Sequence, residues 1–225
     1  MRQKEFWLWI LVGLLGLSGP CHAELPPPED FPGALVNYEN PPKELKELNA
    51  ILSQEAAFQA RFILSVYKLG IERPVNSEGR VVFDVEKGLL WQTLSPYKEA
   101  LWVNQDGVFH LSSQGKERVG DDPGFYRKLQ EFSQGSMAKL GSEAALYFGV
   151  KEELWEIKVV PQSGVLAANV AEFRIRGSRG VIYWVRLFLR DKTVMSIRLA
   201  DFQRYKDSFG ETEFFFLEPR RDFIP

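Results

Sequence analysis

The chain has 225 residues, 45% of them hydrophobic, and a formal net charge of -2 at pH 7. This near-neutral charge excludes the strongly basic surface on which nucleic-acid binding depends. The presence of a single cysteine, Cys21, excludes a disulfide framework within one chain.

The N-terminus has the organisation of a secretory signal peptide. Arg2 and Lys4 precede an uncharged, largely apolar run over residues 6–17, and a Ser-Gly-Pro break and the small residue Ala23 follow it. The apolar run is about a dozen residues long, whereas a membrane-spanning helix needs roughly 20. We expect a signal peptide over residues 1–23, cleaved after Ala23. A membrane anchor and a lipoprotein acylated at Cys21 are the alternatives.

Removal of this leader limits the chemistry that remains. Cys21 and His22 leave with it, so the exported protein has no thiol and its one imidazole is that of His110. A zinc site of Cys and His and a cysteine nucleophile are therefore excluded within one chain. We expect no metal and no cofactor.

Two segments precede the first predicted strand. Residues 24–42 are rich in proline and predict an extended lead-in. Residues 43–54 predict an amphipathic helix, because Leu45, Leu48 and Leu52 fall on one face and charged residues on the other. We assign residues 43–225 to a single domain.

Most of the remaining chain predicts strands. From residue 57 to residue 67 the hydrophobic period is two, and the apolar side consists of Phe58, Ala60, Phe62, Leu64 and Val66. Turns are expected at Gly70, Pro74 and residues 76–79, and Asp106-Gly107 predicts a hairpin. Further strands are expected over residues 80–85, 89–93, 100–104, 108–112, 154–161, 165–168, 171–176, 181–190, 193–202 and 213–217.

Helices are predicted at two later places. Asp122 suits a helix cap and Pro123 the first helical position, so we expect a helix from Pro123 to about Phe132. More helical turns are expected over residues 137–148. The order helix, strands, helix, strands predicts an α+β fold, mostly antiparallel β, with a few helices against one face of the sheet.

Few residues are candidates for catalysis. His110 lies in a predicted strand, without a G-x-S-x-G nucleophile turn elsewhere in the chain. The carboxylate pair Asp121-Asp122 precedes Pro-Gly, where a helix cap explains it. We therefore predict a protein that is not an enzyme.

The segment from Gly177 to Gly180 lacks the lysine of a phosphate-binding loop and predicts a hairpin turn. We interpret the basic residues around it, Arg174, Arg176 and Arg179, as a solvated sheet edge, with a lipid headgroup as the alternative partner.

Large apolar side chains are abundant. The chain has 17 phenylalanines, and the exported part has tryptophans at positions 91, 102, 155 and 184. Each large aromatic side chain buries about 150–250 Å². A sheet that is apolar on both faces, with few helices to cover them, predicts a hollow that receives an apolar ligand.

An ordered set of short motifs runs from about Leu45 to Ile224. The first helix is followed by Phe58-x-Ala60-x-Phe62, Gly79, Leu89-x-Trp91, Pro96, and Val103 with Asp106-Gly107, and the chain ends in FFFLEPRRDFIP. This set resembles the periplasmic outer-membrane lipoprotein carriers, the LolA-like family, of which the chain would be a divergent member.

The resemblance implies a half-open, incomplete β-barrel with helices lidding its concave face and a hydrophobic cavity for acyl chains. Carried over by position, the cavity lining is Leu52 on the first helix, Leu89, Trp91 and Val103 on strands, and Leu146 and Phe148 on a second helical lid. The carriers latch the lid with an arginine. At that position this chain has Val85-Glu86, with Lys87 nearby.

The leading hypothesis is a non-enzymatic periplasmic carrier that binds the acyl chains of a lipoprotein or other amphiphile and transfers it toward the outer membrane. Its partners would be that amphiphile, an inner-membrane donor complex and an outer-membrane acceptor complex, and the carrier itself would be a monomer. The alternative is a periplasmic lipid-sensing or regulatory binding module of the same fold that contacts a membrane complex.

Overall fold

The computed structural model describes residues 31, 33–120, 143–210 and 214. In this part of the chain twelve strands form one antiparallel sheet, accompanied by the helices α2 (Lys43–Leu52) and α4 (Gly164–Asn169). The strands are β1 (Ala34–Leu35), β2 (Ala57–Tyr67), β3 (Val75–Asp84), β4 (Gly88–Ser95), β5 (Glu99–Asn104), β6 (Gly107–Ser112), β7 (Gly115–Gly120), β8 (Ala144–Lys151), β9 (Leu154–Pro161), β10 (Val170–Ser178), β11 (Val181–Leu189) and β12 (Val194–Tyr205).

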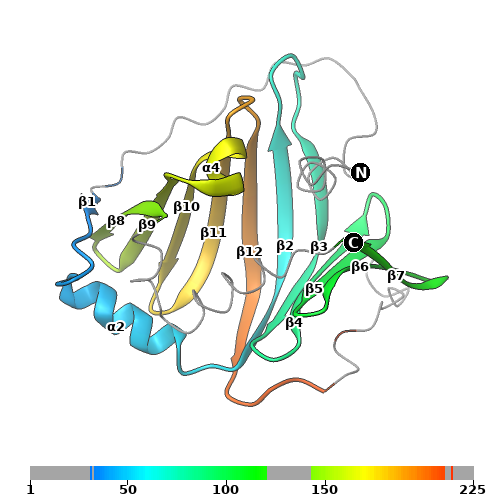
Figure 1. The fold of residues 1–225 in the computed structure, drawn as a ribbon, viewed down its shortest axis with the longest axis horizontal. Coiled ribbons are helices and arrows are strands. Elements are labelled where there is room, and N and C mark those ends of the chain that lie inside the picture. Colours follow the sequence, from blue (N-terminus) through cyan, green and yellow to red (C-terminus); the bar gives the residue numbers. More distant parts are fainter. Residues whose placement is uncertain (1–30, 32, 121–142, 211–213, 215–225) are drawn as a thin grey trace.

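Two meanders make up this sheet. Strands β2 to β7 pair in chain order, strands β8 to β12 do the same, and β12 pairs with β2 to join them, while β1 is added beside β8. Figure 1 shows that β4 to β7 turn out of the plane of β8 to β12. The edges of the described sheet are β1 and β7, which do not pair, so the barrel stays open. The predicted fold class, an incomplete β-barrel, is confirmed.

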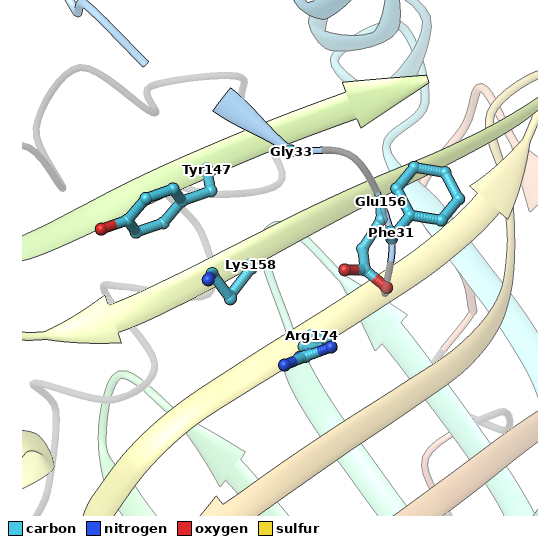
Figure 2. A pocket seen from close by; sticks show the side chains of 6 residues that line it. All are labelled: Phe31, Gly33, Tyr147, Glu156, Lys158 and Arg174. Atoms are coloured by element: carbon cyan, nitrogen blue, oxygen red, sulfur yellow. The ribbon is translucent and has the colours of Figure 1, made fainter. Parts of the chain in front are cut away.

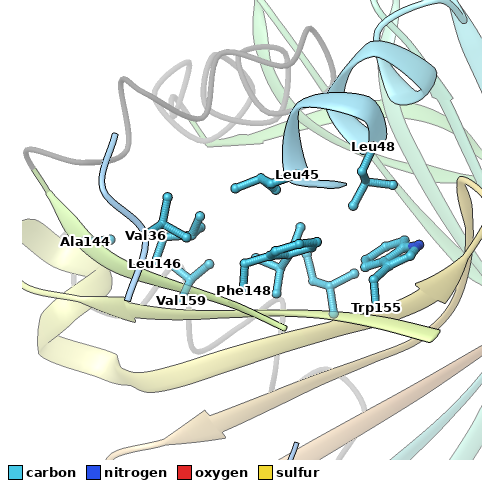
Figure 3. Close-up of a cluster of buried hydrophobic side chains, with 10 residues drawn as sticks. Val36, Leu45, Leu48, Ala144, Leu146, Phe148, Trp155 and Val159 are labelled. Carbon is cyan, nitrogen blue, oxygen red and sulfur yellow. The ribbon is translucent and has the colours of Figure 1, made fainter. Parts of the chain in front are cut away.

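Helix α2 matches its prediction closely. It begins after Pro42 and ends at Leu52, two residues before the predicted end. Leu45 and Leu48 are buried, and Leu52 is partly buried. Figure 3 shows α2 over β8 and β9, with both buried leucines directed at the sheet. The helix is therefore held by its apolar face, as its sequence pattern requires.

Strand β8 corrects one helix prediction. Helical turns were expected over residues 137–148, of which 137–142 lie outside the described residues. Ala144, Leu146 and Phe148 lie on a strand and are buried at every second position. A short apolar run such as AALYFGV fits either a buried helix or a strand, and periodicity alone does not separate them. Pairing with β9 along its whole length decides for the strand.

Two further predictions differ from the structure, and one strand was not predicted. Residues 165–168 were expected as a strand and lie in α4, where leucine and alanine favour the helix. Gly70 and Pro74 lie between β2 and β3 as predicted, but residues 76–79, also expected to turn, belong to the unbroken strand β3. Strand β7 was not predicted, because its charged and glycine residues give no apolar alternation.

The hairpin predictions are confirmed. Asp106-Gly107 joins β5 to β6, and residues 178–181 join β10 to β11. The predicted helix over 123–132 and, except for Phe214, the predicted strand over 213–217 lie outside the described residues. Among the described residues, no helix has the length and apolar character to cross a membrane.

Candidate ligand-binding face

The two faces of the sheet differ in character. Cross-strand pairing places six apolar residues in one row, namely Phe148, Ile157, Ile175, Val185, Ile197 and Leu64. Because directly paired residues point to the same side of a sheet, this row lies on one face. Helix α2 packs on the same face, which we call the inner face, and the opposite side is the outer face.

The inner face has a helix-covered region next to α2 (Figure 3). Leu45 and Leu48 of α2 pack there against side chains of β8, β9 and β10. The buried members of the region are Val36, Leu45, Leu48, Ala144, Leu146, Phe148, Trp155, Ile157, Val159 and Ile175. This region has the burial of an ordinary protein core.

The inner face continues into a central region on β2, β3, β4, β11 and β12. Its buried members are Ala60, Phe62, Leu64, Val66, Val81 and Met195. Its partly exposed apolar members are Phe58, Val75, Leu89, Trp91, Leu187, Leu189, Ile197, Leu199 and Phe202. Partly buried apolar side chains thus outnumber fully buried ones here, so the central region is less closed than the helix-covered region.

A stacked pair of aromatic rings lies in the central region. The ring centroids of Phe62 and Trp91 are 3.9 Å apart and their planes differ by 24°. Gly79 lies beside Phe62 in the pairing between β2 and β3. A Cβ at Gly79 would overlap the carbonyl oxygen of Gln92 and lie 2.8 Å from Phe62 Cζ. Glycine is therefore required at this position for close packing.

The three strand residues predicted to line the cavity share the inner face. Trp91 pairs with Val81 on one side and Leu101 on the other. Leu89 pairs with Val103 two residues along the same strands. Leu89 and Trp91 are partly exposed, whereas Val103 is buried against Val108. Leu89 and Trp91 are thus accessible, and Val103 supports the face from within a smaller cluster.

The other three predicted lining residues belong to the helix-covered region. Leu146 and Phe148 are buried on β8, and Leu52 of α2 is partly buried against the same cluster. The structure therefore places the six predicted residues on one face, but in two groups. Their assignment to ligand binding stays a prediction.

Sequence reasoning did not include the residues of β11 and β12 in the site. Leu187, Leu189, Ile197 and Leu199 are partly exposed members of the central region. The alternation of apolar residues in VIYWVRLFL was a usable signal, but it does not say which side faces a ligand. Only the pairing of β12 with β2 brings these side chains near Trp91.

His110, the residue considered for catalysis, lies on β6 opposite Leu101. The nearby Glu99 on β5 is half-buried, and this burial raises its pKa, while the charge of His110 lowers it. In the described part of the chain the two side chains form no hydrogen bond with each other or with a nucleophile. Nor does any group of three His, Cys, Asp or Glu side chains there have a geometry for a metal ion.

The position of the carriers' lid latch is occupied differently in this chain. The Lys87 ammonium donates a hydrogen bond to the carbonyl oxygen of Phe209, in the segment after β12. Asp84 accepts hydrogen bonds from the amides of Glu86 and Lys87, and from Ser208 Oγ at 2.6 Å and the Phe209 amide at 2.8 Å. Both side chains therefore hold the segment after β12 rather than α2.

These hydrogen bonds control the charge of Asp84. Burial by itself raises the pKa of this carboxyl, but the hydrogen bonds from Ser208 and the three amides outweigh burial. The net result is a pKa below the ordinary value. Asp84 is therefore a structural anion at neutral pH.

A pocket of about 80 Å³ lies on the outer face, away from the central region. Its lining residues are Phe31, Gly33, Tyr147, Glu156, Lys158 and Arg174. The lining is mainly polar, so this pocket is not the predicted apolar hollow.

No protein-family model matches the sequence, and no curated protein matches it. Solved structures do match the fold. A LolA superfamily protein from Nitrosomonas europaea is 7% identical over 80% of this chain and 97% of that chain, with a TM-score of 0.41. A DUF1329 family protein from Desulfovibrio piger is 11% identical over 76% of this chain and 96% of that chain, with a TM-score of 0.43.

A third match is to the complex of MucA and MucB from Pseudomonas aeruginosa. The identity is 11% over 76% of this chain and 59% of that chain, and the TM-score is 0.45. The matches include the superfamily that the sequence motifs resemble. At these identities the likeness concerns the fold.

Proposed function

We propose that this protein is a non-enzymatic carrier that shields the acyl chain of a lipoprotein or other amphiphile on its inner face. The observation that carries the proposal is the central region, where nine apolar side chains remain partly exposed on one face of the sheet. Contact between water and the exposed parts of these side chains is unfavourable, and an apolar ligand would remove it.

The energetics support reversible binding. Burying an acyl chain of about fifteen methylenes gains on the order of 12 kcal/mol before costs, at roughly 0.8 kcal/mol for each methylene. Ordering the ligand and the side chains that contact it reduces this gain. An open barrel leaves one side of the acyl chain less completely buried, which reduces the free-energy gain on binding further. A carrier needs such intermediate affinity, because it must release its cargo.

The proposed setting is the periplasm, which the predicted leader favours. There the carrier would take its amphiphile from an inner-membrane donor complex and transfer it to an outer-membrane acceptor complex. The chemistry of the inner face requires only an acyl chain, so lipoproteins and other acylated molecules are both suitable cargo.

Uptake by charge variants tests the proposal. The exported protein is stripped of ligand, offered a radiolabelled diacyl lipopeptide, and analysed by gel filtration and native mass spectrometry. Trp91→Glu places a charge in the central region and is expected to abolish uptake. Ile63→Glu is the matched control, because Ile63 is 40% exposed and follows Phe62 on the same strand, so that it points to the outer face.

Two results would contradict the proposal. One is a wild-type protein that carries no amphiphile on purification and takes up none. The other is normal uptake by a folded Trp91→Glu protein, which would make Trp91 a core residue only.

The second candidate is a lipid-sensing or regulatory module that contacts a protein complex. The observation in its favour is β7, an edge of the described sheet whose first five residues are exposed. A partner strand can pair with such an edge. Transfer between vesicles separates the two candidates, since a carrier delivers its labelled amphiphile to acceptor vesicles and a sensor retains it.

A further inference from the structure

The outer face carries a row of cations on three neighbouring strands. Lys158 on β9 pairs directly with Arg174 on β10, which pairs directly with Arg186 on β11. Arg176 and Arg198 flank Trp184 in the adjacent row. Like charges placed opposite each other destabilise a sheet. The arrangement therefore costs stability unless an anion compensates it.

Carboxylates of the protein compensate only part of this charge. Arg174 Nε is 2.7 Å from Glu172 Oε1, and Arg176 Nε pairs with Glu156 Oε2. Among the described residues, Lys158, Arg186 and Arg198 have no ion-pair partner. Within the described ranges, three of the five cations are therefore not neutralised by a paired carboxylate.

Aromatic rings hold the cations in place. Lys158 Nζ is 4.1 Å from the ring centroid of Tyr147, and the Arg186 guanidinium is 4.1 Å from that of Trp184. The Trp184 indole is itself fixed by a 2.9 Å hydrogen bond from Nε1 to Ser196 Oγ. Side chains stacked in this way lose little further freedom when they bind an anion.

Arg186 is the least satisfied of these groups. Its Nε is buried and has no hydrogen-bond acceptor in the described part of the chain. Burial lowers the pKa of its guanidinium, and the charges of Arg176 and Arg174 lower it further, against the opposing effects of Tyr67 and Glu156. A nearby anion would relieve this repulsion.

The pocket of about 80 Å³ lies at one end of the cation row (Figure 2). Lys158 and Arg174 form part of its wall, and Glu156, already paired with Arg176, forms another part. Pockets for drug-sized ligands measure roughly 300–1,000 Å³. This pocket is therefore suited to one small polar group and not to an acyl chain.

We propose that the pocket between Lys158 and Arg174 binds a single phosphate group. The forked donors of arginine match phosphate oxygens, and lysine adds a point charge. Glu172 accepts a hydrogen bond only from Nε of Arg174. The two Nη groups of Arg174 therefore remain as donors for phosphate oxygens. The phosphate can belong to a phospholipid headgroup or to a soluble molecule. Because this site is on the outer face, phosphate can bind there while an acyl chain occupies the inner face.

Calorimetric titration of the exported protein with inorganic phosphate is the first test. Wild-type protein is expected to bind, and Lys158→Gln/Arg174→Gln to bind about tenfold more weakly or not at all, since charge-assisted hydrogen bonds are lost. The control is Arg61→Gln/Arg179→Gln, which removes two charges whose side chains are 58% and 78% exposed and paired with Asp201 and Glu153. It should bind as wild type does.

If the double variant does not fold, Lys158→Gln alone can be used for the phosphate titration, because this substitution removes no ion pair.

A second set of measurements identifies the source of the phosphate group. Sedimentation with vesicles of phosphatidylcholine plus phosphatidylglycerol, reversed by phosphate, would assign the site to a headgroup. Phosphate binding without vesicle binding would assign it to a soluble phosphorylated ligand.

Three outcomes would overturn the proposal. They are an absence of phosphate binding, equal weakening in the pocket and control variants, and binding of a polyglutamate peptide in place of phosphate. The last would make the outer face a surface for an acidic protein segment.

Discussion

The helix-covered region and the central region belong to the same face of one sheet, yet they differ in burial. The first has ten buried members and five partly buried neighbours. The second has six buried members and nine partly buried neighbours. The strands of both regions carry the same apolar alternation. The first region contains the leucines of α2 together with Val36 and Tyr38 from the segment before it, whereas the second contains no residue of α2.

This comparison indicates how one sheet provides both stability and a binding surface. Apolar area removed from water by α2 stabilises the fold. Apolar area left partly exposed contributes less to folding and remains available to a ligand. Substitutions in the two regions should therefore separate effects on unfolding from effects on ligand uptake.

The largest effect is expected from Ile157→Ala in the helix-covered region. Ile157 is fully buried on β9, so its truncation should leave a cavity and lower the free energy of unfolding by about 3–4 kcal/mol. Urea denaturation measures this. Acyl-chain affinity should stay near wild type under conditions where the variant is folded. If Ile157→Ala lost acyl-chain affinity without losing stability, the helix-covered region would also belong to the ligand-binding surface.

Gly79→Ala should come next, because it adds a methyl group where none fits. The overlap with Gln92 and Phe62 is expected to cost about 2–3 kcal/mol and to disturb the Phe62–Trp91 stack. Denaturation and near-ultraviolet circular dichroism report both changes. Gly33→Ala is the control, since its Cβ would meet only ordinary contacts at 3.6 Å and beyond. Equal stability of the two variants would contradict the packing described for Gly79.

Asp84→Asn should cost about 2 kcal/mol, because charge-assisted hydrogen bonds from the β3–β4 turn and from the segment after β12 are weakened. The folded pKa of Asp84 lies below its ordinary value of 3.8, so its contribution is present above that pH. The contribution is lost as pH falls through the folded pKa. The stability gap between wild type and variant should therefore narrow below about pH 4. A gap that is constant with pH would show that the charge of Asp84 is not what matters.

The smallest effect on stability is expected from Leu187→Ala in the central region. Leu187 is already partly exposed, so truncation should cost about 1 kcal/mol. Acyl-chain affinity should fall about fivefold, because the removed methyl groups would contact the ligand. The comparison with Ile157→Ala is direct, since both side chains lie on the inner face. Unchanged affinity would remove Leu187 from the proposed site.

Local patterns predicted most elements correctly. The alternation from Phe58 to Val66 correctly predicted β2 and its buried side, and the spacing of Leu45 and Leu48 correctly predicted α2. The failures occurred where local pattern is ambiguous, as in β8, or where a long-range contact decides. Gly79 was interpreted as part of a turn, whereas the structure needs it for the approach of β4 and Phe62.

The candidate site could be predicted only in part, for the same reason. Trp91 and Leu89 follow from motifs on one strand. The contribution of β11 and β12 depends on the β2–β12 pairing, which joins residues more than a hundred positions apart and leaves no local signal. The cation row of Lys158, Arg174 and Arg186 likewise exists only through strand register.

Photo-cross-linking with an acyl chain that carries a diazirine group identifies the residues that contact the ligand. The exported wild-type protein is loaded, irradiated and digested, and the labelled peptides are identified by mass spectrometry. If the inner face binds the acyl chain, we expect labels on β4, β11 and β12, at or beside Trp91, Leu187 and Ile197. Labels confined to the outer face, or no label at saturating ligand, would contradict this expectation.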